Sequence, residues 1–150
     1  MGIKLQNKAQ LTKEIEATRI KYEKALIYEL ESAVVELTNH AKQSAEYKDR
    51  TANLKSSIGG VLLRGGKPIT YKGFQQQAAT ADTGAQTGME YINSLIQNFQ
   101  LPGYTIILVA GMEYASYVQD KHGYNVLKKT ELKARMDLPK AVQRLKTLMK

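Results

Sequence analysis

The chain has 150 residues, which is enough for one domain with a single hydrophobic core. It contains no cysteine, so disulfides and thiolate metal sites are excluded, and its two histidines, His40 and His122, have no ligand-like spacing. The formal net charge of +8 favours an acidic partner. Nucleic acid, a membrane surface and a negatively charged protein are the three alternatives.

Hydropathy argues against a membrane span. No apolar run approaches the roughly 20 residues that cross a bilayer. Residues 1–10 also lack the apolar centre of a secretory signal. We therefore expect a protein that is made in the cytoplasm and has no membrane partner.

The strongest periodic pattern predicts a long helix from about Thr12 to Ala45. One face of it carries apolar residues at steps of three and four: Tyr22, Leu26, Leu30, Val34, Leu37 and Ala41. His40 lies off this face, so we expect its side chain to be exposed. A helix of this length spans about 45 Å, which is more than a domain of this size covers. Part of the helix is therefore expected to contact another chain.

The long helix is expected to end in a corner at residues 49–58. The side chains of Thr51 and Asn53 compete with the helix for backbone hydrogen bonds. Leu54 and Ile58 are spaced to point into the core beyond the break. This pattern predicts a turn between two layers, and by itself it indicates no chemistry.

The segment Ile58–Tyr71 predicts two short strands joined by a glycine turn. The glycine-rich turn superficially matches a phosphate-binding loop. However, Pro68 occupies the place of the Ser or Thr that would hold magnesium, and no helical pattern follows. We therefore expect no nucleotide site. The small, polar segment 73–88 predicts a surface loop.

A short amphipathic helix is predicted to begin at Met89 and to end before Leu101. The run Tyr104–Ala110 is rich in β-branched residues and continuously apolar in its second half, which predicts a central strand covered on both faces. A short helical turn is predicted at Met112–Gln119, and a short extended piece at Tyr124–Leu127.

The last segment predicts two helical pieces that meet near Leu138, with Asp137 as the N-cap and Pro139 in the first turn of the second piece. Together the elements predict an α+β fold. In this fold a long N-terminal helix and further helices pack on one face of a small, mostly antiparallel β-sheet. We expect residues 1–150 to form a single domain with a flexible loop at 73–88.

The sequence contains no recognisable catalytic motif. An enzyme usually needs a nucleophile beside a base, paired carboxylates, a metal cluster or a cofactor loop. The sequence places no such residues together. We therefore predict that the chain is not an enzyme, with no catalytic residue, no metal and no cofactor.

Two segments match short signatures that occur in the same order and at a similar separation in one known family. Arg50–Ile58, preceded by the helical segment 33–42, is similar to a helix followed by Thr-Gly-Asn-Leu-Arg-x-Ser-Ile. Val109–Gln119 is similar to a strand followed by Tyr-Ala-x-Tyr-Val-Glu. In these segments the chain resembles the tail-completion and head-to-tail joining proteins of long-tailed bacteriophages.

This resemblance implies a structural virion protein, made in the bacterial host cytoplasm, that forms a homo-oligomeric ring at the head-to-tail junction. Such a connector, neck or tail-completion protein joins the capsid portal complex to the tail tube, and six or twelve copies are the family expectation. The motif residues that the resemblance assigns to the fold and to subunit contacts are Arg50, Thr51, Asn53, Leu54, Ser57, Ile58, Tyr114, Ala115, Tyr117 and Val118.

Most of the excess positive charge lies in the last segment of the chain. There, Lys140, Arg144 and Lys146 are expected to face either DNA in the channel of a ring or acidic patches on neighbouring rings. An alternative function is a basic nucleic-acid-binding module that uses this C-terminal helix on duplex DNA. No aromatic residues interleave with the lysines, as a stacking surface for single strands requires.

Overall fold

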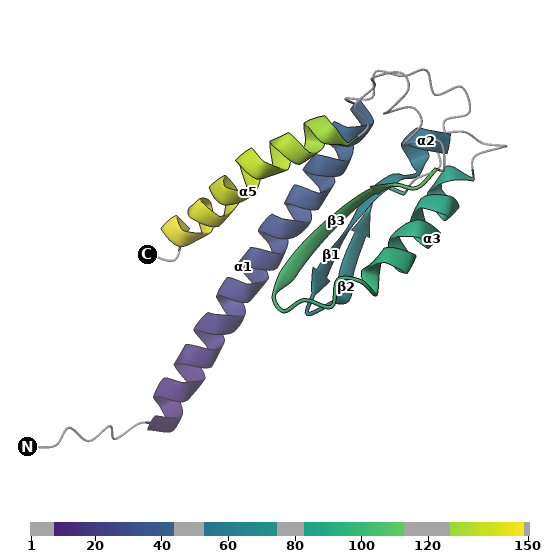
Figure 1. The fold of residues 1–150 in the computed structure, drawn as a ribbon. Coiled ribbons are helices and arrows are strands. Elements are labelled where there is room, and N and C mark those ends of the chain that lie inside the picture. Colours follow the sequence, from purple (N-terminus) through teal and green to yellow (C-terminus); the bar gives the residue numbers. More distant parts are fainter. Residues whose placement is uncertain (1–7, 44–52, 75–82, 113–126, 149–150) are drawn as a thin grey trace, which may run out of the picture.

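A computed structural model describes residues 8–43, 53–74, 83–112 and 127–148 of the chain. The fold is α+β, as predicted, with a long N-terminal helix and a small antiparallel sheet (Figure 1). Its elements in chain order are α1 (Lys8–Gln43), α2 (Asn53–Ser56), β1 (Ile58–Arg64), β2 (Lys67–Lys72), α3 (Gly84–Ile96), β3 (Tyr104–Ala110) and α5 (Lys128–Leu148).

The sheet has the strand order β2-β1-β3, and both pairs are antiparallel. The predicted hairpin is confirmed: Gly65 and Gly66 both have positive φ, as a two-residue turn of this kind requires. Among the described strands β1 occupies the centre and β3 lies at an edge, so the prediction of β3 as a central strand is wrong for this part of the chain. One face of β3 is covered, because Ile107 and Val109 pack against α3, whereas Ile106 and Leu108 on the other face are half-buried.

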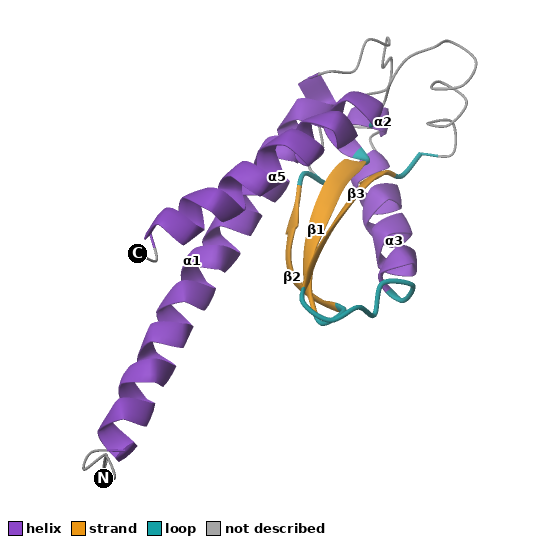
Figure 2. Ribbon diagram, turned by 60° about the vertical axis from the view of Figure 1, so that its left-hand side comes forward, coloured by secondary structure: helices purple, strands orange, loops and turns teal. Residues whose placement is uncertain are grey.

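Helices lie on both faces of the sheet, not on one face as predicted. Because strand side chains alternate, Val61 and Leu63 of β1 point to α3 and pack with its Ile92 and Ile96. On the opposite face, Ile58 packs against Ala41 of α1. Figure 2 shows the sheet between the two helices. The order of layers is therefore α1, sheet, α3.

Helix α5 packs along α1, outside the sheet (Figures 1 and 2). It runs without a break through Pro139, so the prediction of two helical pieces is wrong. The side chain of Asp137 forms an ion pair with Lys133 one turn earlier and does not act as an N-cap. That ion pair holds the pKa of Asp137 below its ordinary value, chiefly through the hydrogen bond from Lys133. Proline has no backbone amide, so α5 lacks one backbone hydrogen bond at this position.

Helix α3 begins at Gly84, five residues before the predicted start at Met89. The last part of the predicted loop 73–88 is therefore helical, and Gly84 and Gly88 are buried. These residues offer no apolar side chain, so hydrophobic periodicity did not reveal them. Within the same predicted loop, residues 75–82 lie outside the described residues.

His40 is half-buried, whereas the sequence predicted an exposed side chain. Its Nδ1 atom lies 2.9 Å from the hydroxyl oxygen of Thr130, a buried residue in the first turn of α5. The contact joins residues 90 positions apart, so it ties the ends of α1 and α5 together. The predicted helical turn at Met112–Gln119 and the extended piece at Tyr124–Leu127 fall almost wholly outside the described residues.

Replacement of Pro139 by Ala is expected to raise the free energy of unfolding by about 1–3 kcal/mol. Alanine restores the amide that proline lacks and has the highest helix propensity. Urea denaturation of Pro139→Ala and of the exposed control Gln143→Ala measures the effect. An unchanged midpoint for Pro139→Ala would show that α5 is broken at this position.

Candidate interaction surface

The motif segment Asn53–Ile58 forms a junction between three elements, and we call it the α2 junction. The Asn53 carbonyl oxygen accepts hydrogen bonds from the Ser57 amide at 3.0 Å and from the Ser56 hydroxyl at 3.1 Å. The Ser57 hydroxyl donates to the Leu54 carbonyl oxygen at 2.8 Å. These local bonds satisfy the polar groups of a short helix that is buried on one side.

The same junction reaches the start of α3 and the end of β3. The amide of Thr83, which precedes α3, donates to Oδ1 of Asn53 at 3.1 Å. The amide of Gly111, just after β3, donates to the Ser57 carbonyl oxygen at 3.2 Å. Leu54 and Ile58 are fully buried in a cluster with Ala41, as predicted for a corner. The four described residues of the first motif therefore serve the fold.

Helix α3 presents two glycines, Gly84 and Gly88, to the α2 junction. A Cβ atom at Gly84 would overlap the Asn53 carbonyl oxygen, and one at Gly88 would overlap the Ser57 carbonyl oxygen. Glycine thus permits backbone-to-backbone packing that any side chain would prevent. Sequence reasoning missed this contact. The available signal was the four-residue spacing of the glycines, which places them on one helix face.

Six of the ten motif residues lie outside the described residues: Arg50, Thr51, Tyr114, Ala115, Tyr117 and Val118. The structure therefore places only Asn53, Leu54, Ser57 and Ile58. Asn53 and Leu54 lie in α2, Ser57 follows that helix and Ile58 begins β1.

The three basic residues singled out on α5 do not share one face. Lys140 and Arg144 line a groove of about 370 Å³ between α1 and α5, together with Glu29 and Glu36 of α1. Arg144 is paired with Glu29 at 3.3 Å. Lys146 lines a different groove on the other side of α5. The charges of α5 are thus partly directed at α1, within the same chain.

The N-terminal part of α1 extends beyond the other described helices and strands (Figure 1). Every residue of Lys8–Thr18, which we call the projecting segment, is exposed. It nevertheless carries large apolar side chains: Leu11 is 41% exposed and Ile15 is 62% exposed. These two continue, at a helical spacing, the apolar face whose later members Val34, Leu37 and Ala41 are buried.

A groove of about 490 Å³ lies beside the projecting segment, and we call it the lateral groove. It is bounded by α1, by the C-terminal half of α5 and by the start of β3. Its lining residues are Arg19, Tyr22, Glu23, Leu26, Tyr104, Val142, Leu145 and Lys146. Val142 is 42% exposed, so the apolar wall of the groove faces solvent in the isolated chain.

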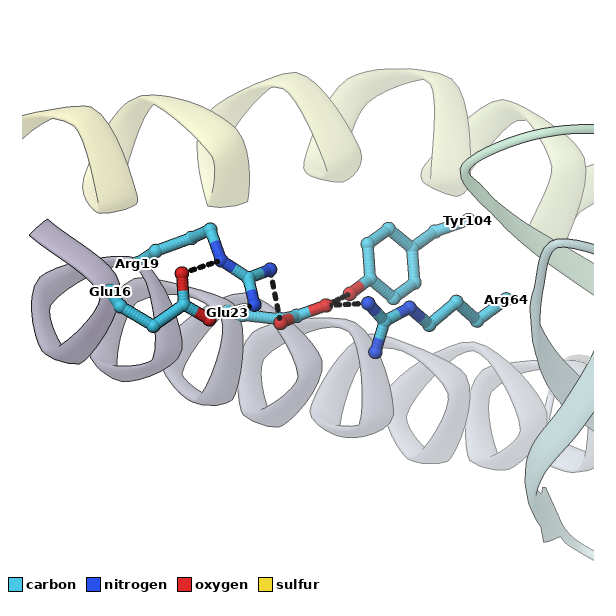
Figure 3. A network of polar contacts seen from close by, with 5 residues as sticks. All are labelled: Glu16, Arg19, Glu23, Arg64 and Tyr104. Atoms are coloured by element: carbon cyan, nitrogen blue, oxygen red, sulfur yellow. Dashed lines mark hydrogen bonds and ion pairs between the residues drawn. The ribbon is translucent and has the colours of Figure 1, made fainter. Parts of the chain in front are cut away.

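A polar network at the floor of the lateral groove fixes α1 against the sheet (Figure 3). The carboxylate of Glu23 accepts a hydrogen bond from the Tyr104 hydroxyl at 3.2 Å and pairs with Arg64 at the end of β1. It also pairs with Arg19 at 3.4 Å. Burial raises the pKa of Tyr104 above its ordinary value. Sequence reasoning missed this network, because Glu23, Arg64 and Tyr104 are far apart in the chain.

Within the described ranges, no group of three or more His, Asp or Glu side chains is placed to hold a metal ion. No helix in those ranges is both long and apolar enough to cross a bilayer. Comparison of the chain with models of protein families, with curated proteins and with solved structures found no match.

Substitution of Gly84 by Ala is expected to lower the free energy of unfolding by about 1–2 kcal/mol, because the new methyl group forces α3 away from the α2 junction. The higher helix propensity of alanine opposes this loss only in part. The matched control is Gln86→Ala, an exposed position on the same helix. Equal denaturation midpoints for the two variants would contradict the close packing.

Substitution of Glu23 by Gln is expected to lower the free energy of unfolding by about 1–2 kcal/mol, because three donors lose a charged acceptor in a mostly buried position. The control is Glu16→Gln, which removes an exposed pair with Arg19 on the same helix and is expected to leave the midpoint unchanged. Guanidinium is unsuitable as denaturant because it screens charges, so urea is used. Similar losses in both variants would contradict a special role for Glu23.

Proposed function

We propose that this chain is a structural virion protein that forms a homo-oligomeric ring at the head-to-tail junction of a long-tailed bacteriophage. In that place it acts as a connector, neck or tail-completion protein between the portal complex and the tail tube. The observation that carries the proposal is the projecting segment. Its apolar side chains extend the core face of α1 beyond the part that the other described elements cover.

A solvent-exposed continuation of a core stripe is the feature expected of a subunit. Large apolar residues at positions Leu11 and Ile15 lose the free energy of burial unless another chain covers them. A helix segment of this length is also marginal in water without tertiary contacts. Assembly into a ring supplies both the cover and the helical order.

The motif residues support the family resemblance through the fold. The described motif residues connect α2 with the start of α3, the start of β1 and the end of β3. They are Asn53, Leu54, Ser57 and Ile58. The described part of the motif thus acts as a structural signature.

The alternative of a duplex DNA-binding module is less well supported. It requires Lys140, Arg144 and Lys146 to face one DNA backbone together. Instead, the first two line a groove that also contains Glu29 and Glu36, and the third lines the lateral groove. We therefore propose contacts between α5 and protein in the assembled ring.

Electron microscopy of the phage particle that encodes this chain tests the proposal. We expect its density in a ring between portal and tail tube, with the projecting segment against a neighbouring copy. Salt-dependent binding of the purified chain to duplex DNA is the companion measurement. A particle without the chain, combined with steep salt-dependent binding that is lost in Lys140→Gln/Arg144→Gln/Lys146→Gln, would overturn the proposal in favour of the nucleic-acid-binding module.

A further inference from the structure

The chain carries two separate apolar surfaces that do not cover one another. The first is the pair Leu11 and Ile15 on the projecting segment, one helical turn apart and on one face. The second is the lateral groove, whose apolar wall includes Val142 and Leu145. They are separated along α1: Tyr22 is the first residue of the apolar stripe that lines the groove. It comes after Ile15 in the chain and lies about 16 Å along the helix axis from Leu11.

We propose that the projecting segment of one copy docks into the lateral groove of the next copy. Leu11 and Ile15 would enter between α1 and α5 of the neighbour and pack on Tyr22, Val142 and Leu145. This arrangement places a third helix against an existing helix pair, and it buries both exposed surfaces in one contact. The inference rests on the proposed function for the closure of the ring.

Charge supports a second copy as the occupant. Glu14 lies beside Leu11 and Ile15 on the projecting segment, and no described cation is paired with it; its carboxylate accepts a hydrogen bond from Gln10. Lys146 lines the groove one turn after Val142, and no described carboxylate is paired with it. Docking brings these opposite charges together at the rim of an apolar contact, where they favour the correct register.

The two surfaces are different, so the contact is head-to-tail. Each copy offers one segment and one groove, and repetition of such a contact closes a ring when the rotation between copies fits. A self-complementary contact would instead join two copies by a two-fold axis and stop at a dimer. A ring that joins different proteins at its two ends requires the head-to-tail form.

Disulfide trapping tests the contact, because the chain has no cysteine and every thiol can be introduced by design. Chains with Leu11→Cys are mixed with chains with Val142→Cys and oxidised gently. Both positions are exposed, so the variants are expected to fold. Docking brings the two thiols within bonding distance, and we expect the mixed dimer to form about ten-fold faster than in the control mixture, because docking raises their effective concentration.

The control mixture pairs Leu11→Cys with Ile69→Cys, an exposed apolar position on β2 away from the groove. Equal rates in the two mixtures would overturn the proposal, and so would a predominance of Leu11–Leu11 dimers, which indicates a self-complementary contact. A chain carrying both Leu11→Cys and Val142→Cys is expected to give a ladder of covalent oligomers. The distance along α1 prevents a bond within one chain.

Swapping the charges at Lys146 and Glu14 tests the same contact independently. Lys146→Glu in the Val142→Cys chain is expected to slow trapping by Leu11→Cys several-fold, and Glu14→Lys in the Leu11→Cys chain is expected to restore it. A loss without restoration overturns the assigned register. Trapping in a chain that is absent from the virion would refute the proposed function alone, whereas a virion ring without trapping would refute only this contact.

Discussion

The burial of β1 between α1 and α3 is the constraint on which the rest of the structure depends. Every residue from Ile58 to Leu63 is buried, with alternate side chains committed to opposite helices. This strand fixes the C-terminal half of α1 on the sheet, and the α2 junction fixes α3 on the other face. Once those positions are set, none of the described elements covers the projecting segment, whose residues are all exposed. Among the described residues, the packing that stabilises the domain therefore leaves this end of α1 at the surface.

Much of the fold is predictable from the sequence because the signals are local. The stripe from Tyr22 to Ala41 repeats at a helical spacing over five turns, and the Gly65-Gly66 turn has few alternatives between two apolar runs. The inward-pointing pair Leu54 and Ile58 follows from the same reasoning. Even the expectation that α1 is too long for its domain needs only its length and the rise of a helix.

The errors arise where the deciding contact is distant in sequence or carries no hydropathy. Gly84 and Gly88 pack closely because they have no side chain. Their segment is small and polar, so the sequence predicted a loop where α3 begins. His40 meets Thr130 across 90 positions, and Glu23 meets Arg64 and Tyr104. No periodicity encodes such pairs. The lateral groove is likewise a product of tertiary packing, because α1, β3 and α5 contribute to it together.

Hydrogen exchange of the backbone amides of α1 tests most directly whether other copies supply the missing cover. In the isolated chain, amides after Leu30 are expected to exchange slowly and those of Lys8–Thr18 rapidly, since every residue of the latter segment is exposed. In the assembled particle both regions are expected to be protected. Amides of Lys8–Thr18 that exchange as rapidly in the particle as in the free chain would contradict an assembly held together by this part of the helix.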